Sequence, residues 1–313
     1  MNKIVALYKY HQQNSLSECI YNEDKSVMLM CAGSIYNHIE LKAILESKGH
    51  CFTSNHDVEV IIHLYEEYGK DCLKHLSGTF GFCLYDAKKN ELFAARDRMG
   101  EKTLYYSEIP GRVVFSTELK TILKDYITDP QLDIKQLMGS VRYTGPIDNE
   151  KTYIKQIKRL GAGEYICVNE HGLKRYTYWN RHLFRENRIN VSLDEAKKNI
   201  ETLLRESVNY SLQTDKPLAV MLSGGIDSSL VAKLAKDTGR EVHTITAGYK
   251  GSHACDERDV ARRFAAEQGF IHHEIELDEQ DFQYCFEEFT QAMDEPITDS
   301  AAMAQWALFK KVK

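Results

Sequence analysis

The stretch Met221-Leu-Ser-Gly-Gly-Ile-Asp-Ser-Ser229, MLSGGIDSS, decides the fold of the second half of this chain. The run PLAVMLS (217–223) is typical of a short apolar strand, and the run DSSLVAKLAKDTG (227–239) has the apolar spacing of a helix. A strand, a glycine turn and a helix in this order aim several free backbone N–H groups at one point beside the positive end of the helix dipole. The stretch therefore predicts a site for phosphate oxygens.

The residue types inside the turn fit a polyphosphate held together with a metal ion. Gly224 and Gly225 would let the backbone approach an anion without a Cβ in the way, and the three serines of the stretch can each donate a hydroxyl, namely Ser223, Ser228 and Ser229. The carboxylate of Asp227 would repel phosphate unless a cation such as Mg²⁺ joins the two. The plainer alternative is that Asp227 or Ser228 only caps the helix after a tight turn.

Strand and helix patterns continue to alternate after this stretch. The runs are EVHTITAGY (241–249), DERDVARRFAAEQG (256–269), HHEIEL (272–277) and DEQDFQYCFEEFTQAM (278–293). Repeats of this kind imply a parallel sheet with right-handed crossovers. Asp256 and Glu257 suit the start of a helix, where acids face the positive end of the dipole. His272 and His273 are neighbours in a predicted strand, so they point to opposite faces and cannot bind one metal together.

The first half of the chain has a different pattern, in which short β-rich runs are separated by Gly, Asn, Asp or Pro. These runs are KIVALY (3–8), VMLMCAG (27–33), TFGFCLYD (79–86), ELFAARD (91–97), TLYYSE (103–108), RVVFST (112–117), GEYICVNE (163–170) and LKRYTYW (173–179). Two helices are predicted, HIELKAILESKG (38–49) and DVEVIIHLYEEYG (57–69). The pattern predicts an α+β domain with antiparallel sheets.

A polar segment at 180–192 reads as a linker between the two patterns, and the run from Ser192 to Glu195 offers a capping box for the helix that follows. We therefore expect one domain at 1–185 and another at 190–313.

Composition excludes several classes of protein. The chain has 313 residues, a formal net charge of -6 and no extended basic block, so nucleic acid is not an expected partner. No apolar stretch approaches the 18 or so residues that a membrane span requires, so no membrane partner is expected. The eight cysteines form no C-x-x-C pair, which indicates reduced thiols and a cytoplasmic location rather than a disulfide framework or a zinc ribbon.

Several long motifs, in one order from about residue 29 to 313, closely resemble the glutamine-dependent asparagine synthetase family. In the first half they are GSIYNHIELKAILESKGHCFTSNHDVEVIIHLYEEYG (33–69), LSGTFGFCLYD (76–86), ARDRMGEKTLYY (95–106) and FSTELKTIL (115–123). In the second half they are LSGGIDSS (222–229), DE (256–257), HHE (272–274) and DEPITDS (294–300). LSGGIDSS is similar to the SGGxDS pattern of the ATP pyrophosphatases.

The resemblance implies a fold and a reaction. The N-terminal domain resembles a class II, Ntn-type glutaminase sandwich of antiparallel sheets, and the C-terminal domain resembles part of a parallel-sheet ATP-pyrophosphatase domain. ATP and Mg²⁺ are the implied cofactors, because the family adenylates a carboxylate and then captures the acyl group with ammonia. The implied pyrophosphate contacts are Leu222, Ser223, Gly224, Gly225, Asp227 and Ser228, with Asp227 also binding Mg²⁺, and the implied adenine contacts are Ala247 and Gly248.

The chain departs from the family at the glutaminase site. The family uses a cysteine at position two, where this chain has Asn2, and it has N-G-E where this chain has Ala32-Gly33-Ser34. The latter change removes the asparagine amide of the oxyanion hole and a glutamate that grips the substrate amine. Gly33 and Asp57 remain as remnants of the glutamine site, and we expect glutamine hydrolysis to be lost. Cys31, Cys51 and Cys83 are expected to be core thiols rather than replacement nucleophiles.

The resemblance also implies that the C-terminal domain is truncated. The family continues beyond DEPITDS into an acidic loop with another Mg²⁺ ligand and then a lysine that stabilises adenylation, so this chain encodes one side of the ATP site. Glu295 and Asp299 match a family stretch near the acceptor, and their roles stay open.

Four interpretations of the chain remain open. The chain is either an ATP-dependent amide-forming protein that uses a small carboxylate and free ammonia or another amine, or a biosynthetic enzyme similar to β-lactam synthetase. The third alternative is a non-catalytic or split-enzyme subunit, in a homodimer or with a partner subunit that supplies the missing C-terminal half. The fourth is a chain that is simply cut short.

Overall fold

The computed structural model describes residues 19–143, 145–184, 190–213, 216–251 and 256–312. The chain divides into two compact units, one formed by Met1–Arg188 with Asp294–Thr298 and one formed by Ile189–Met293 with Asp299–Lys313. The strand predicted at 3–8 lies outside the described residues, as does part of the predicted linker, 185–189. The domain limits from the sequence stay a prediction.

The first unit is built on a six-stranded sheet in the order β1-β2-β3-β4-β8-β9, in which all neighbours are antiparallel. The strands are β1 (Ile20–Tyr21), β2 (Val27–Ile35), β3 (Gly78–Asp86), β4 (Glu91–Arg96), β8 (Glu164–Asn169) and β9 (Gly172–Thr177). The aromatic and β-branched runs of the sequence thus form the strands predicted for them, because their large side chains fill a half-buried pleated surface.

Another sheet, three-stranded and antiparallel, has the order β6-β5-β7. Its strands are β5 (Tyr105–Ile109), β6 (Arg112–Ser116) and β7 (Lys158–Arg159). Tyr106 and Phe115 from this sheet share one buried apolar cluster with Cys83 and Ala94 from the large sheet. The expected sandwich of antiparallel sheets is therefore confirmed, and its core lies between the two sheets.

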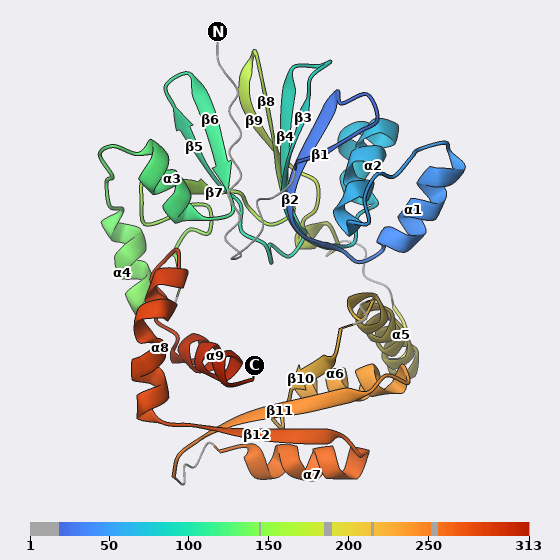
Figure 1. Cartoon of the computed structure of the whole chain (residues 1–313), viewed down its shortest axis with the longest axis vertical. Coiled ribbons are helices and arrows are strands. Elements are labelled where there is room, and N and C mark those ends of the chain that lie inside the picture. Colours follow the sequence, from blue (N-terminus) through green and yellow to red (C-terminus); the bar gives the residue numbers. More distant parts are fainter. Residues whose placement is uncertain (1–18, 144, 185–189, 214–215, 252–255, 313) are drawn as a thin grey trace. The chain divides into compact units, whose positions relative to one another are not determined.

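Two helices pack against the large sheet, and two others follow the strand β6 of the small sheet along the chain. Figure 1 shows α1 and α2 beside β1 and β2, and Leu45 and Ile61 from these helices join Phe80 and Phe82 in a further core cluster. The bounds are α1 (His38–Ser47), α2 (Val60–Tyr68), α3 (Leu119–Tyr126) and α4 (Ile134–Tyr143), with 3-10 turns η1 (Asp57–Glu59), η2 (Gly69–Lys74) and η3 (Arg181–Phe184). The sequence predicted α1 and α2 but not α3 and α4, although α4 is as long as α1.

The second unit contains a parallel three-stranded sheet in the order β10-β11-β12, which confirms the predicted partial α/β arrangement. Its elements are α5 (Leu193–Ser211), β10 (Leu218–Met221), α6 (Ile226–Asp237), β11 (Val242–Tyr249), α7 (Arg258–Gln268), β12 (Ile271–Leu277), α8 (Glu279–Ala292) and α9 (Ser300–Lys311). Ala232 of α6 and Ala265 of α7 pack in one buried cluster with Leu222. Across the described ranges, no helix combines the length and the apolar character that a membrane crossing needs.

The segment Asp294–Thr298 belongs to the first unit although it follows the helices of the second along the chain. The carboxylate of Glu295 pairs with the guanidinium of Arg159 and also accepts a hydrogen bond from the Tyr105 hydroxyl at 3.2 Å. Tyr153 donates its hydroxyl to the carbonyl of Pro296 at 3.3 Å. Burial lowers the pKa of Arg159, but the charge of Glu295 outweighs it and the net shift is upward. Glu295 thus has a structural partner, which the sequence did not indicate.

Gly33 of β2 is required by the close pairing of β2 with β3. Its φ of +132° is unfavourable for a residue with a side chain, and a Cβ there would lie 1.9 Å from the carbonyl oxygen of Thr79. We expect Gly33→Ala to destabilise the first unit by about 3 kcal/mol, measured by urea unfolding. The matched control is Gly172→Ala, with φ of +99° and open space, where we expect a loss of about 1 kcal/mol. Equal losses in the two variants would contradict the clash.

Candidate functional site

The turn after β10 is fixed by two hydrogen bonds to the neighbouring strand. The N–H of Leu222 donates to the carbonyl of Ile245 at 2.8 Å, and the hydroxyl of Thr246 donates to the carbonyl of Leu222 at 2.6 Å. Leu222 and Thr246 are both buried, so water does not compete for these bonds. Sequence reasoning missed Thr246, although a polar residue at an inward position of an apolar strand is a detectable signal.

Gly224 and Gly225 make the turn that the sequence predicted. Gly224 has φ of +76°, and a Cβ there would lie 3.1 Å from side-chain carbons of Val260 in α7. Gly225 is the N-cap of α6, and no side chain caps this helix. The alternative in which Asp227 or Ser228 serves as the cap is therefore not what the structure has. The first backbone N–H groups of α6 keep their capacity to bind an anion.

The polar side chains of the turn lie around these N–H groups. The hydroxyls of Ser223 and Ser228 are 2.9 Å apart, and the Ser223 hydroxyl also accepts a hydrogen bond from the N–H of Gly225 at 3.3 Å. Asp227 lies in the first turn of α6 and is exposed. An exposed carboxylate beside a group of N–H and O–H donors can bind a cation that an anion in the turn would share.

Ala247 and Gly248 lie at the same edge of the sheet as this turn, because β10 and β11 are parallel and pair Met221 with Ile245. Ala247 is exposed, whereas Gly248 is covered by a side chain. A Cβ on Gly248 would lie 2.2 Å from Nε of Arg258. The structure thus brings the predicted contacts of the second unit together.

Arg258 is another residue that sequence reasoning missed. Its guanidinium binds the carboxylate of Asp256 through Nε and Nη2, with Nη2–Oδ2 at 2.5 Å, and it donates to Glu276 at 3.2 Å and to the carbonyl of Tyr249 at 3.1 Å. The hydrogen bonds that Arg258 donates to the Asp256 carboxylate raise the pKa of Arg258. The expected helix start at Asp256 and Glu257 is confirmed, since Glu257 is the N-cap of α7.

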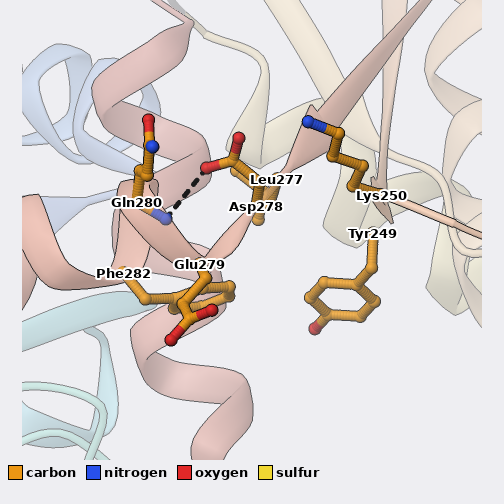
Figure 2. Close-up of a pocket in the computed structure, with 7 residues that line it drawn as sticks. All are labelled: Tyr249, Lys250, Leu277, Asp278, Glu279, Gln280 and Phe282. Carbon is orange, nitrogen blue, oxygen red and sulfur yellow. Dashed lines mark hydrogen bonds between the residues drawn. The ribbon is translucent and has the colours of Figure 1, made fainter.

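A hollow of about 710 Å³ lies at the carboxyl ends of β11 and β12. Figure 2 shows its lining, with Tyr249 and Lys250 on one side and Asp278, Glu279 and Phe282 on the other. The Asp278 carboxylate accepts hydrogen bonds from the N–H groups of Gln280 and Asp281, which caps α8. Ligands of open α/β sheets bind at this end of the strands. The carboxylates of Asp278 and Glu279 would repel a polyphosphate, so we do not include this hollow in the predicted phosphate site.

The predicted histidine arrangement of β12 is confirmed. The Nε2 of His273 lies 2.8 Å from Nδ1 of His243, and the Nδ1 of His272 lies 2.9 Å from the hydroxyl of Thr244. The two neighbours therefore bind different partners on opposite faces of the sheet, and they form no joint metal site.

In the first unit, the two remnants of the predicted glutamine site lie close together. Gly33 pairs with Phe80 across β2 and β3, and the carboxylate of Asp57 accepts a hydrogen bond at 2.6 Å from the N–H of Ile35. Asp57 also borders a hollow of about 430 Å³, together with His38. The carboxylate of Asp57 already has a partner within the fold.

The structure supports the core interpretation for two of the three cysteines considered as nucleophiles. Burial raises the pKa of the thiols of Cys31 and Cys83, which opposes thiolate formation. The prediction for Cys51 was wrong, because it lies exposed in the loop after α1 and not in a strand. Its N–H donates to the carboxylate of Glu23 at 3.0 Å.

Two protein families match the chain. Residues 11–179 match the glutamine amidotransferase domain and residues 199–313 match asparagine synthase. The chain belongs to the glutamine-dependent asparagine synthetase family. Asparagine synthetase [glutamine-hydrolyzing] 2 of Bacillus subtilis is 33% identical over 81% of this chain and 35% of its own length. Amidase chyE of Penicillium rubens is 30% identical over 93% of this chain and 45% of its own.

The chain spans about a third to a half of the length of the curated relatives that it matches. Among solved structures, a glutamine phosphoribosylpyrophosphate amidotransferase of Bacillus subtilis with ADP and GMP is similar at 16% identity and a TM-score of 0.39, over 84% of this chain and 48% of that one. An NH3-dependent NAD synthetase of Campylobacter jejuni is similar at 21% identity and a TM-score of 0.26, over 39% and 49%. These TM-scores are too low to add to the family assignment.

Exposure predicts how the thiols react. With an aromatic disulfide reagent at pH 8, we expect Cys51 to be modified first, because it is exposed. Burial raises the pKa of Cys72 to about 12, and Cys72, Cys83 and Cys167 are buried, so these thiols should react only on unfolding. The fast phase should lose one thiol in Cys51→Ser and keep it in Cys72→Ser. Equal rates for Cys51 and Cys72 would contradict the structure.

Proposed function

We propose that this chain takes part in ATP-dependent amide formation, in which a carboxylate is adenylated and an amine then captures the acyl group. Membership of the asparagine synthetase family supports the reaction class. The observation that carries the proposal is the uncapped start of α6, where the N–H groups after Gly225 and the hydroxyls of Ser223 and Ser228 converge. The seven unpaired cysteines among the described residues agree with a proposed cytoplasmic location.

ATP and Mg²⁺ are the proposed cofactors, and the donors present suit them. The turn would hold the pyrophosphate part of ATP through N–H and O–H donors, with Ala247 and Gly248 towards the adenine. Asp227 supplies the hard oxygen ligand that Mg²⁺ prefers. Mg²⁺ would neutralise phosphate charge that repels Asp227. The Thr246 hydroxyl orients the turn through the Leu222 carbonyl, because it fixes the residue at which the turn begins.

Residues 222–228 contain no lysine or arginine, so this turn alone neutralises little of the charge that develops when pyrophosphate leaves. The remaining charge neutralisation would come from residues that pack near the turn in the active assembly. A split or paired synthetase is therefore the other candidate. β10 forms one edge of its sheet within the described residues, and Met221 and Ile226 near that edge are exposed. A partner subunit or another copy of this chain could complete the site there.

We further propose that the glutaminase site is inactive and that free ammonia or another small amine is the nitrogen donor. Ala32-Gly33-Ser34 lies near the end of β2, paired to β3, and offers neither the amide nor the carboxylate expected of the family there. Asp57 is the remaining acid, and its carboxylate binds the N–H of Ile35. One acid can position an amine but cannot attack an amide or stabilise an oxyanion.

The metal dependence of ATP binding tests the proposed function of Asp227. With Mg²⁺, we expect Asp227→Asn to weaken ATP binding about tenfold, or ~1.4 kcal/mol, because it removes a metal ligand. In EDTA the sign should reverse, because the carboxylate then only repels phosphate. Calorimetry on the whole chain measures both. The matched control is Asp194→Asn, at an exposed position of α5, which should change neither value. Identical effects of Asp227→Asn on ATP binding with and without Mg²⁺ would show that Asp227 does not bind the metal.

Pyrophosphate exchange tests the need for a partner. Radiolabel exchange between pyrophosphate and ATP is measured with Mg²⁺ and a panel of carboxylic acids that includes aspartate. We expect little exchange by this chain alone and recovery when a protein encoded beside it is added. Strong exchange by the chain alone would contradict the proposal that residues of a partner must neutralise the charge of the leaving pyrophosphate. Absence of exchange both by the chain alone and with the added protein, together with intact ATP binding, would favour a non-catalytic subunit that binds nucleotide.

Glutamine hydrolysis is expected to be absent. Incubation of the chain with glutamine should release no glutamate above the background of Asp57→Asn, whereas amide formation should follow added ammonia in the mixture that restores exchange. Release of glutamate that Asp57→Asn abolishes would overturn the proposed loss.

A further inference from the structure

Three side chains with metal-binding atoms meet in the first unit, away from both predicted sites. Glu23 lies in the turn after β1, His50 in the loop after α1, and His63 in α2. One nitrogen of each imidazole and one carboxylate oxygen of Glu23 lie within 4.8 Å of one another. The three residues come from segments far apart in the sequence, so local spacing did not reveal the group.

The two imidazoles also point at one oxygen atom. The Nδ1 of His63 lies 3.1 Å from Oε2 of Glu66, and the Nδ1 of His50 lies 3.6 Å from the same oxygen. Ligand atoms on a tetrahedron with zinc bonds of ~2.0–2.1 Å are roughly 3.3 Å apart. The observed separations lie on either side of that value, so little movement would place an ion among Glu66 and the two imidazoles.

The other nitrogen of each ring faces a different carboxylate. The Nε2 of His50 lies 3.1 Å from Glu67, and the Nε2 of His63 lies 3.9 Å from Glu59. His50 has the usual arrangement of a metal-binding histidine, in which the nitrogen that does not bind the metal donates to a carboxylate. His63 is 1% exposed, and its Nε2 faces Glu59 without forming a hydrogen bond. An ion at Nδ1 of His63 would add a second ligand on this buried ring beside Glu66.

The position between Nδ1 of His50 and Glu66 favours a positive charge. When His50 donates from Nε2 to Glu67 and carries no other proton, its Nδ1 lone pair faces the Glu66 carboxylate, and a proton or a metal ion between them removes the repulsion. The ammonium of Lys48 does not occupy this position, because it binds Glu67 at 2.5 Å.

We propose that Glu23, His50, His63 and Glu66 bind a zinc ion. Two imidazole nitrogens with two carboxylate oxygens make a borderline donor set that suits zinc better than Mg²⁺ or Ca²⁺, which prefer oxygen alone. With four protein ligands the coordination is closed, so the ion has a structural function rather than a catalytic one.

The ion would join three segments that are otherwise linked by a few hydrogen bonds of side chains with side chains or backbone. The other oxygen of Glu66 accepts a hydrogen bond from Asn22 at 2.8 Å, and Glu23 accepts one from the N–H of Cys51 at 3.0 Å. The loop that carries His50 and Cys51 leads directly into Asp57. Zinc therefore holds the base of this loop against α2.

Cobalt reports the ligands directly, because tetrahedral Co²⁺ absorbs visible light and a bound thiolate adds a near-ultraviolet charge-transfer band. The whole chain is stripped with EDTA, exchanged into buffer and titrated with Co²⁺ and then Zn²⁺. We expect one equivalent of Co²⁺ with a tetrahedral spectrum and no thiolate band, displacement by one equivalent of Zn²⁺, and a rise in Tm of several degrees with Zn²⁺.

The variants are Glu23→Gln, which is exposed and leaves α2 intact, and His50→Gln, with His171→Gln in the exposed turn before β9 as the matched control. We expect zinc affinity to fall at least tenfold in the first two and to stay unchanged in His171→Gln. Circular dichroism checks that each variant is folded. The proposal is overturned by absence of binding, by a thiolate band, or by affinity that Glu23→Gln and His50→Gln both leave within threefold of the parent.

Discussion

The hydrogen bond from the Thr246 hydroxyl to the Leu222 carbonyl sets the register on which the second unit depends. Together with the bond from the Leu222 N–H to Ile245, it ends β10 at one residue and makes the chain turn there. The glycines then have room to turn under α7, and α6 starts with no side chain over its N–H groups. A small shift in this pairing would move every donor of the proposed phosphate turn, because all of them follow within six residues.

In the first unit, a residue retained from the predicted glutamine site also serves the sheet. Gly33 of β2 lies opposite Phe80 of β3, and a Cβ there would lie 1.9 Å from the carbonyl oxygen of Thr79. The family resemblance drew attention to this position for its chemistry, whereas the structure gives it a packing function. Ala32 and Ser34, which stand where the family has asparagine and glutamate, pair with β3 in the same register, so the sheet does not depend on those two glutaminase groups.

Sequence patterns predicted the helices and strands whose apolar residues recur at regular spacing. They missed the residues whose function depends on partners distant in the sequence. The runs that became β3, β4, β11 and α7 have clear alternation or helical spacing, so their type followed directly. Cys51 was expected in the core because a free cysteine is usually buried, but it lies exposed in a loop. The glycine turn of the candidate site was predicted with its side chains, but Thr246 and Arg258 were not, because they act through three-dimensional pairing. The grouping of His50 with His63 likewise required the packing of α2 against a loop.

The path of Asp294–Thr298 means that the first unit is not one continuous piece of chain. A fragment of residues 1–188 would lack Glu295 and leave the guanidinium of Arg159, which is 11% exposed, beside Tyr105 without its anion. Removing one member of such a buried pair costs about 3 kcal/mol or more. An excised fragment of this kind would therefore unfold easily in limited proteolysis or domain dissection. The low stability would come from the loss of Glu295 and not from the amidotransferase-like fold itself. Recombination between relatives has the same constraint, because the short segment after α8 and the sheet that holds Arg159 must be inherited together.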